Sequence, residues 1–235
     1  MCPPTPDVIA DRLATYSTRL RTGSLTRAKA LWSVWQSYND AHNPLRDDRL
    51  PRHQGSATLN LMASAVLHET IMIVVRAFDR AGQRGPFRTD KVSFPVLLAL
   101  VEQAGVREEL EQRARIWLPD GWQGDENARA CLQAIDAIAA ILARLDAEQP
   151  NRQRRLRDFR DEFLAHNLQF DFRRDAPIFN DVTTLIDELT QLSDAAELAF
   201  NGNAVHWDVL NGDMQQSAAS LWAAIRVGAR ANAVG

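Results

Sequence analysis

Apolar residues recur at spacings of three and four along almost the whole chain, and stretches that alternate apolar and polar residues are nearly absent. The first spacing is that of helices with one buried face, whereas alternation would indicate strands. The pattern therefore predicts an all-α protein, an antiparallel helical bundle with short connections. No internal repeat or linker divides the sequence, so we expect a single domain over residues 1–235.

Helices are expected wherever this spacing holds, with ends at glycines, prolines and polar clusters. Gly23 is expected to end the first helix, and Ser24 to cap the second. The helix from Ser56 to Arg80 is apolar on nearly all sides around residues 71–75, which is typical of a central bundle helix. The expected helices span 7–21, 24–39, 56–80, 95–104, 106–117, 125–148, 150–166, 180–200 and 205–230, with loops at 42–55 and 119–124.

Composition narrows the class of protein. The chain is 46% hydrophobic and 24% charged, enough for a real core, and its net charge of -3 argues against a general nucleic-acid-coating role. Cys2 and Cys131 make neither a disulfide framework nor a metal site. The N-terminus lacks a signal-peptide pattern, and apolar runs such as residues 71–75 are too short to cross a bilayer. We expect a cytoplasmic protein with no membrane contact, metal or other cofactor.

The segment LRDFRDEFLAHN, residues 156–167, carries the candidate chemistry. Cleavage of RNA without a metal requires the 2′-hydroxyl to attack the neighbouring phosphate. His166 could take that proton or give one to the leaving oxygen, and Arg160 could stabilise the phosphate through two parallel hydrogen bonds. Asp161 could orient either the imidazole or the guanidinium group.

The spacing of the motif sets a geometric condition. Six residues of ideal helix rotate a side chain by about 240°, so Arg160 and His166 would not share a face. Either the helix loosens near His166, or the working pair comes from two chains. A two-fold dimer would bring the same helix of each subunit together.

The motif resembles the signature of the HEPN superfamily, in which an arginine and a polar residue precede a histidine. The sequence pattern Arg-Asp-x-x-x-Ala-His at residues 160–166 most resembles that of the abortive-infection U-type (AbiU-like) branch, which is linked to phage resistance. VRAFDR at residues 75–80 and VSFPVLLAL at 92–100 are similar to upstream stretches of that branch. The resemblance covers about residues 56–200. It implies a HEPN-like helical bundle with extra helices, a metal-independent endoribonuclease, and a composite site across a homodimer.

On this interpretation Arg160, Asp161 and His166 are catalytic, and Glu162 and Asn167 support them. The expected substrate is single-stranded or looped RNA, in phage defence or as a toxin, with an antitoxin or activating partner possible. Leu168 stands where a modified tyrosine occurs in HEPN toxins paired with a nucleotidyltransferase, so that pairing is disfavoured. Between residues 150 and 174, seven arginines against four acidic residues leave about +3. The arginines expected to bind RNA phosphates are Arg152, Arg154, Arg155, Arg157, Arg173 and Arg174.

Other interpretations remain open. The charged residues in 157–162 could instead lie on a solvent-exposed helix face and form salt bridges at spacings of three and four residues, with no functional role. Arg46, Asp47 and His53 match the motif loosely too, but in a segment interrupted by Pro51. The alternative function is a non-catalytic HEPN-like module that binds a protein partner or RNA in a defence or toxin–antitoxin system.

Overall fold

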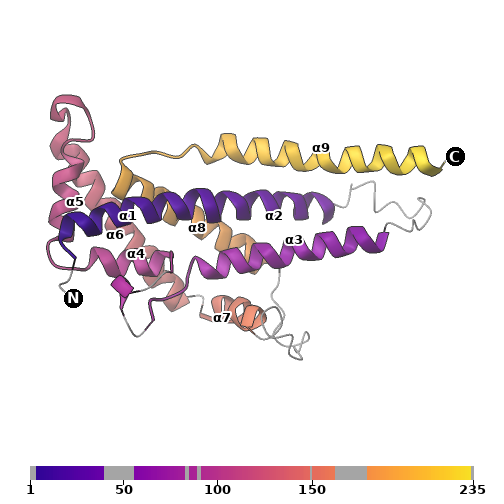
Figure 1. Ribbon diagram of the computed structural model, residues 1–235, viewed down its shortest axis with the longest axis horizontal. Helices are drawn as coiled ribbons and strands as arrows, with labels where there is room; N and C mark the ends of the chain where they lie inside the picture. Colours follow the sequence, from indigo (N-terminus) through magenta and orange to yellow (C-terminus); the bar gives the residue numbers. More distant parts are fainter. Residues whose placement is uncertain are drawn as a thin grey trace. The chain divides into compact units, whose positions relative to one another are not determined.

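The computed structural model describes residues 4–39, 56–82, 85–88, 91–148, 150–161 and 179–233, and Figure 1 shows their helices. Over these residues no strand occurs, which confirms the predicted all-α class. The expected loop at 42–55 lies outside the described residues. The helices are α1 (Pro6–Arg19), α2 (Thr26–Asn39), α3 (Ser56–Arg76), α4 (Phe94–Val101), α5 (Val106–Ala114), α6 (Gly124–Glu148), α7 (Pro150–Asp158), α8 (Phe179–Asn201) and α9 (Trp207–Ala233), with a π-helical segment η1 (Leu20–Leu25) and short 3₁₀ turns η3 (Pro86–Arg88) and η4 (Pro119–Gly121).

The chain divides into two compact units, each built from two separate stretches of sequence. Unit 1 comprises Met1–Leu25 and Ile73–Val205, and unit 2 comprises Thr26–Met72 and His206–Gly235. The chain therefore passes between the units three times. The expectation of a single domain stays a prediction.

Unit 1 is organised around α6, which packs antiparallel to both α5 and α8. Arg107 on α5 pairs with Asp136 on α6 at 2.7 Å, and Arg144 on α6 holds the buried Glu188 on α8 with bonds of 2.9 and 2.6 Å. Helix α1 lies against α8, where Ser17 donates to Glu197 at 2.8 Å. These contacts agree with the predicted antiparallel packing. The largest fully buried side chains of unit 1 are Leu13, Leu20, Leu25, Phe94, Leu97, Leu100, Ile135, Ile138, Leu145, Leu156 and Leu185.

Cys131 lies inside this core and is expected to be chemically inert. Its Sγ lies 3.2 Å from the carbonyl oxygen of Ala199, and burial raises the pKa of the thiol to about 11. A Cys2→Ser variant leaves Cys131 as its one cysteine. Because the thiolate is the reactive form, we expect Cys131 of this variant to react with a chromogenic disulfide reagent at pH 8 only after denaturation. Rapid reaction of the folded variant would contradict this prediction.

Unit 2 consists of α2 with α3 on one side and α9 on the other. Arg27 on α2 pairs with Glu69 on α3 at 2.9 Å, while Tyr38, further along α2, bonds Asn60, so α2 and α3 run antiparallel. Lys29 contacts Asn211 and the Trp222 indole donates to the Val34 carbonyl at 3.1 Å, so α2 and α9 run parallel. Unit 2 thus combines antiparallel and parallel helix pairs.

One described helix, over Thr58–Arg76, is long and apolar enough to cross a membrane by length and composition. The expectation that apolar runs such as residues 71–75 are too short to cross a bilayer did not cover a helix of this length. At the C-terminal end of the helix Ile71, Ile73 and Val74 are buried, whereas Leu61 near the start is 71% exposed. The core helix of a soluble protein passes the same test, so this is weak support for a membrane span.

Most observed helices follow the expected ones to within a few residues. The helix expected over 150–166 is observed as α7 to Asp158 and a π-helical turn to residue 161, and residues 162–166 lie outside the described part of the chain. Two differences are informative. Gly23 was expected to end the first helix and Ser24 to cap the second, but both lie inside the π-helical segment η1. The buried Leu20 and Leu25 anchor the two ends of that segment in the core. A second π-helical turn, residues 159–161, follows α7. A π turn keeps the chain helical while adding a residue, so hydrophobic spacing does not reveal it.

Candidate functional site

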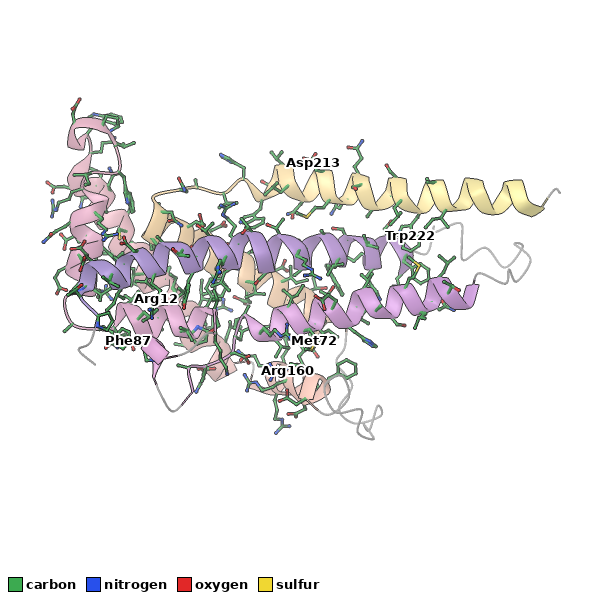
Figure 2. The ribbon with its side chains drawn as sticks, in the orientation of Figure 1. Arg12, Met72, Phe87, Arg160, Asp213 and Trp222 are labelled. Atoms are coloured by element: carbon green, nitrogen blue, oxygen red, sulfur yellow. The ribbon has the colours of Figure 1, made fainter. Side chains whose placement is uncertain are left out.

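Arg160 lies on the π-helical turn that follows α7, and its side chain is only 15% exposed (Figure 2). Its Nε donates to Oδ1 of Asp161 at 2.6 Å, and its Nη1 donates to Oδ1 of Asp79 at 3.0 Å. The bonds to Asp161 and then to Asp79 raise the pKa of Arg160, although its partial burial acts in the opposite direction. The guanidinium group is thus charged and held from two parts of the chain.

Asp79 reaches Arg160 from the loop that connects α3 to α4. This loop is fixed to the start of α4 by two hydrogen bonds: the Ser93 hydroxyl donates to the Asp79 carbonyl at 2.5 Å, and the Phe94 amide donates to the Ala77 carbonyl at 2.9 Å. Ser93 and Phe94 are fully buried. The position of the Asp79 carboxylate is therefore set by the core of unit 1.

This geometry leaves Arg160 able to bind an anion. A guanidinium group carries five N–H donors, and the bonds to Asp161 and Asp79 engage one donor on Nε and one on Nη1. The remaining Nη N–H groups could donate to two phosphate oxygens. Asp79 and Asp161 reduce the net positive field, so a phosphate would be held by directed hydrogen bonds from Arg160 and not by net charge.

Two of the arginines predicted to bind RNA, Arg152 and Arg155, contact a carboxylate within the protein, and their RNA binding stays a prediction. Asp181 at the start of α8 is fully buried, and Arg155 bonds both its oxygens at distances from 2.7 to 3.0 Å. Arg152 adds a bond of 3.1 Å to the same carboxylate and completes the cluster. Arg154 is exposed beside Asp158 at 4.0 Å, and Arg157 is half-buried. Arg154 is therefore the α7 arginine best placed to meet a ligand from solvent.

The remaining predicted site residues lie outside the described part of the chain. They are Glu162, His166, Asn167, Arg173 and Arg174, together with the loosely matching Arg46, Asp47 and His53. The structure thus brings Arg160 and Asp161 together and leaves the place of His166 as a prediction. Over the described residues no group of acidic, histidine or cysteine side chains could hold a metal ion. His68 is half-buried, and desolvation lowers its pKa.

Sequence reasoning missed Asp79 as a site residue. Asp79 belongs to VRAFDR, the stretch that supported the family resemblance, and it lies 81 residues before Arg160. Its place in that stretch is the signal that could have pointed to it. Nothing in the local sequence identifies a partner so far along the chain.

The described residues form helices and their connections, and the Arg160–Asp161 pair follows α7 directly on a π-helical turn. The family model HEPN_AbiU2, described as AbiU2, matches residues 11–220. The chain belongs to this family, as the motif resemblance predicted. No curated protein and no solved structure matches the chain.

Proposed function

We propose that this protein is a metal-independent endoribonuclease that acts in phage defence by abortive infection or as a toxin. The observation that carries the proposal is the position of Arg160, which two carboxylates fix at a helix end while some of its N–H donors remain available. Family membership supports the same assignment. The proposed substrate is single-stranded or looped RNA, in the cytoplasm.

The reaction uses Arg160 and His166 in complementary roles. The 2′-oxygen forms a bond to phosphorus, its proton passes to a base, and the bond from phosphorus to the 5′-oxygen breaks as that oxygen receives a proton. His166 serves as the acid/base, and Arg160 stabilises the charge that develops on the phosphate. Asp161 or Glu162 orients these groups. The products are a 2′,3′-cyclic phosphate and a 5′-hydroxyl.

The proposed working unit is a homodimer with the two motifs facing one cleft. Mixing Arg160→Ala and His166→Ala variants distinguishes a site shared by two chains from one within a chain. If each site takes its arginine and histidine from different subunits, each mixed dimer has one intact site of two. Random subunit exchange makes about half of the dimers mixed, so the mixture regains about a quarter of parental activity. If both residues come from one chain, mixing restores nothing, and a loosened helix must join them.

The decisive test of the activity is cleavage of labelled RNA in EDTA. We expect the parent to release fragments with 2′,3′-cyclic phosphate ends. Cleavage that requires an added divalent ion, or that gives other ends, would contradict the proposed chemistry.

Asp79 is proposed to position Arg160 and so to act through it. A displacement of about 1 Å at a reacting group can cost about 10²-fold in rate, and we expect Asp79→Ala to slow cleavage by that order. The measurement is kcat for a short RNA, in the parent and in an Arg160→Ala background. If Asp79 acts through Arg160, its removal costs nothing further in that background, whereas equal losses in both would contradict a positioning role.

A non-catalytic module that binds RNA or a protein partner is the second candidate. It is favoured by the engagement of Arg160 with two carboxylates and of Arg152 and Arg155 with Asp181. A binder would keep its partner when His166 is replaced and would lose it through changes on the exposed surface. An enzyme would show the opposite response.

A further inference from the structure

A cavity of about 530 Å³ opens in unit 1 beside the loop that carries Asp79. Its walls come from that loop, from α4, from the C-terminal half of α6 and from α7. A volume of this size is typical of small-molecule sites. The lining residues are Phe78, Arg80, Ala81, Pro95, Leu98, Ala99, Glu102, Leu142, Asp146 and Gln153.

The cavity combines apolar walls with charged groups. Leu98, Leu142 and Pro95 offer apolar surface. Arg80 and Asp146 form a 2.6 Å ion pair and are 71% and 54% exposed, and Glu102 is exposed at the end of α4. One arginine against two carboxylates gives the lining a net negative charge.

This charge selects the kind of ligand. Among the described lining residues the one cation, Arg80, is already paired with Asp146, so the lining offers a free anion no unpaired positive charge. A neutral ring fits better: its faces would contact the apolar walls, and its N–H groups would donate to a carboxylate. Nucleobases have this combination, and unpaired RNA bases are recognised through stacking and edge hydrogen bonds.

The cavity is close to Arg160 because the two share a loop. Asp79 contacts Arg160, while Phe78 and Arg80, its direct neighbours, line the cavity. Neighbouring Cα atoms are about 3.8 Å apart. Gln153 lies two helical turns before Arg160, or about 10 Å along the axis of an ideal helix. A nucleotide beside a phosphate bound to Arg160 could place its base here.

We propose that this cavity binds an unstacked nucleobase of the RNA next to the phosphate held by Arg160, with a preference for guanine. The N1–H and N2–H groups of guanine are adjacent donors and match the two oxygens of the Glu102 carboxylate. Adenine, cytosine and uracil do not present two adjacent donors on that edge. The inference rests on the proposed ribonuclease function for its biological role, but base binding can be measured separately.

The first experiment is ligand-detected NMR of guanosine, adenosine, cytidine and uridine with the full chain. We expect saturable binding of guanosine and at least tenfold weaker binding of the others, because hydrogen bonds to a charged group are the strong ones. Glu102→Gln should weaken guanosine binding by a similar factor, and Glu108→Gln, an exposed glutamate on α5, should not. Ala99→Trp should fill the cavity and abolish binding, with circular dichroism as the check on folding.

The second experiment maps cleavage sites on RNAs that differ at one base. In the parent, cuts should fall at a fixed offset from guanine, and Glu102→Gln should remove this preference. Cleavage with no base preference, or equal binding of all four nucleosides, overturns the cavity proposal. Neither result contradicts the proposed ribonuclease function. Guanosine binding at Glu102 without cleavage of any RNA supports the cavity and overturns the ribonuclease.

Discussion

Replacing His166 by alanine is expected to abolish RNA cleavage in EDTA, with a loss of about 10²- to 10⁴-fold for an acid/base residue. Arg160→Ala should cost about 10²- to 10³-fold, since it removes the donor that stabilises charge on the phosphate. The measurement is the rate of appearance of 2′,3′-cyclic phosphate ends under single-turnover conditions. The double variant should be no slower than the worse single one, because the two residues serve one step.

Matched controls separate these roles from general damage. His206 is exposed just before α9, and Arg129 on α6 is a surface arginine beside Glu126. His206→Ala and Arg129→Ala should cleave at the parental rate. Full activity of His166→Ala would remove this histidine from the mechanism, whereas no cleavage by the parent would favour the binding module.

Removing Arg152 and Arg155 together is expected to destabilise the protein by about 3–5 kcal/mol. The Asp181 carboxylate is fully buried, and both arginines form ion pairs with it. Without them this buried charge loses two of its cationic partners. Urea denaturation followed by circular dichroism measures the loss as a lower midpoint at unchanged slope.

A third substitution provides the internal check on this account. Adding Asp181→Leu to the Arg152→Ala/Arg155→Ala variant removes the stranded charge and should recover part of the lost stability. Arg154→Ala, on the exposed face of the same helix, should change the free energy of unfolding by less than about 0.5 kcal/mol. A triple variant less stable than the double would show that the arginines contribute through packing.

Most of the fold could be predicted from the sequence because helical spacing is a local signal. Helix α6 was expected over 125–148 and is observed at Gly124–Glu148, and α8 was expected over 180–200 and is observed at Phe179–Asn201. The π-helical segment at Leu20–Leu25 could not be predicted, because it depends on how two leucines fit the core. The division into two units depends on contacts between distant segments, which hydrophobic spacing does not encode.

The candidate site was predicted in part, for a related reason. Arg160 and Asp161 are neighbours, and the motif contains both. Asp79 contacts Arg160 from 81 residues away, and Asp181 contacts Arg155 from 26 residues away. A count of the charges near the motif therefore predicted RNA binding for Arg155 without revealing Asp181, and it left Asp79 out. A buried carboxylate is a stronger partner for an arginine than solvent is, and only the tertiary structure reveals which arginines have one.

The position of α1 has a consequence for how the protein is made. The Ser17 hydroxyl finds its partner, Glu197, 180 residues later in the chain. At about 5–20 residues per second, a ribosome needs roughly 10–35 s to synthesise that interval. During this time the apolar face of α1 has no α8 to cover it. Because of this order along the chain, nascent α1 must be protected from aggregation until α8 has been made.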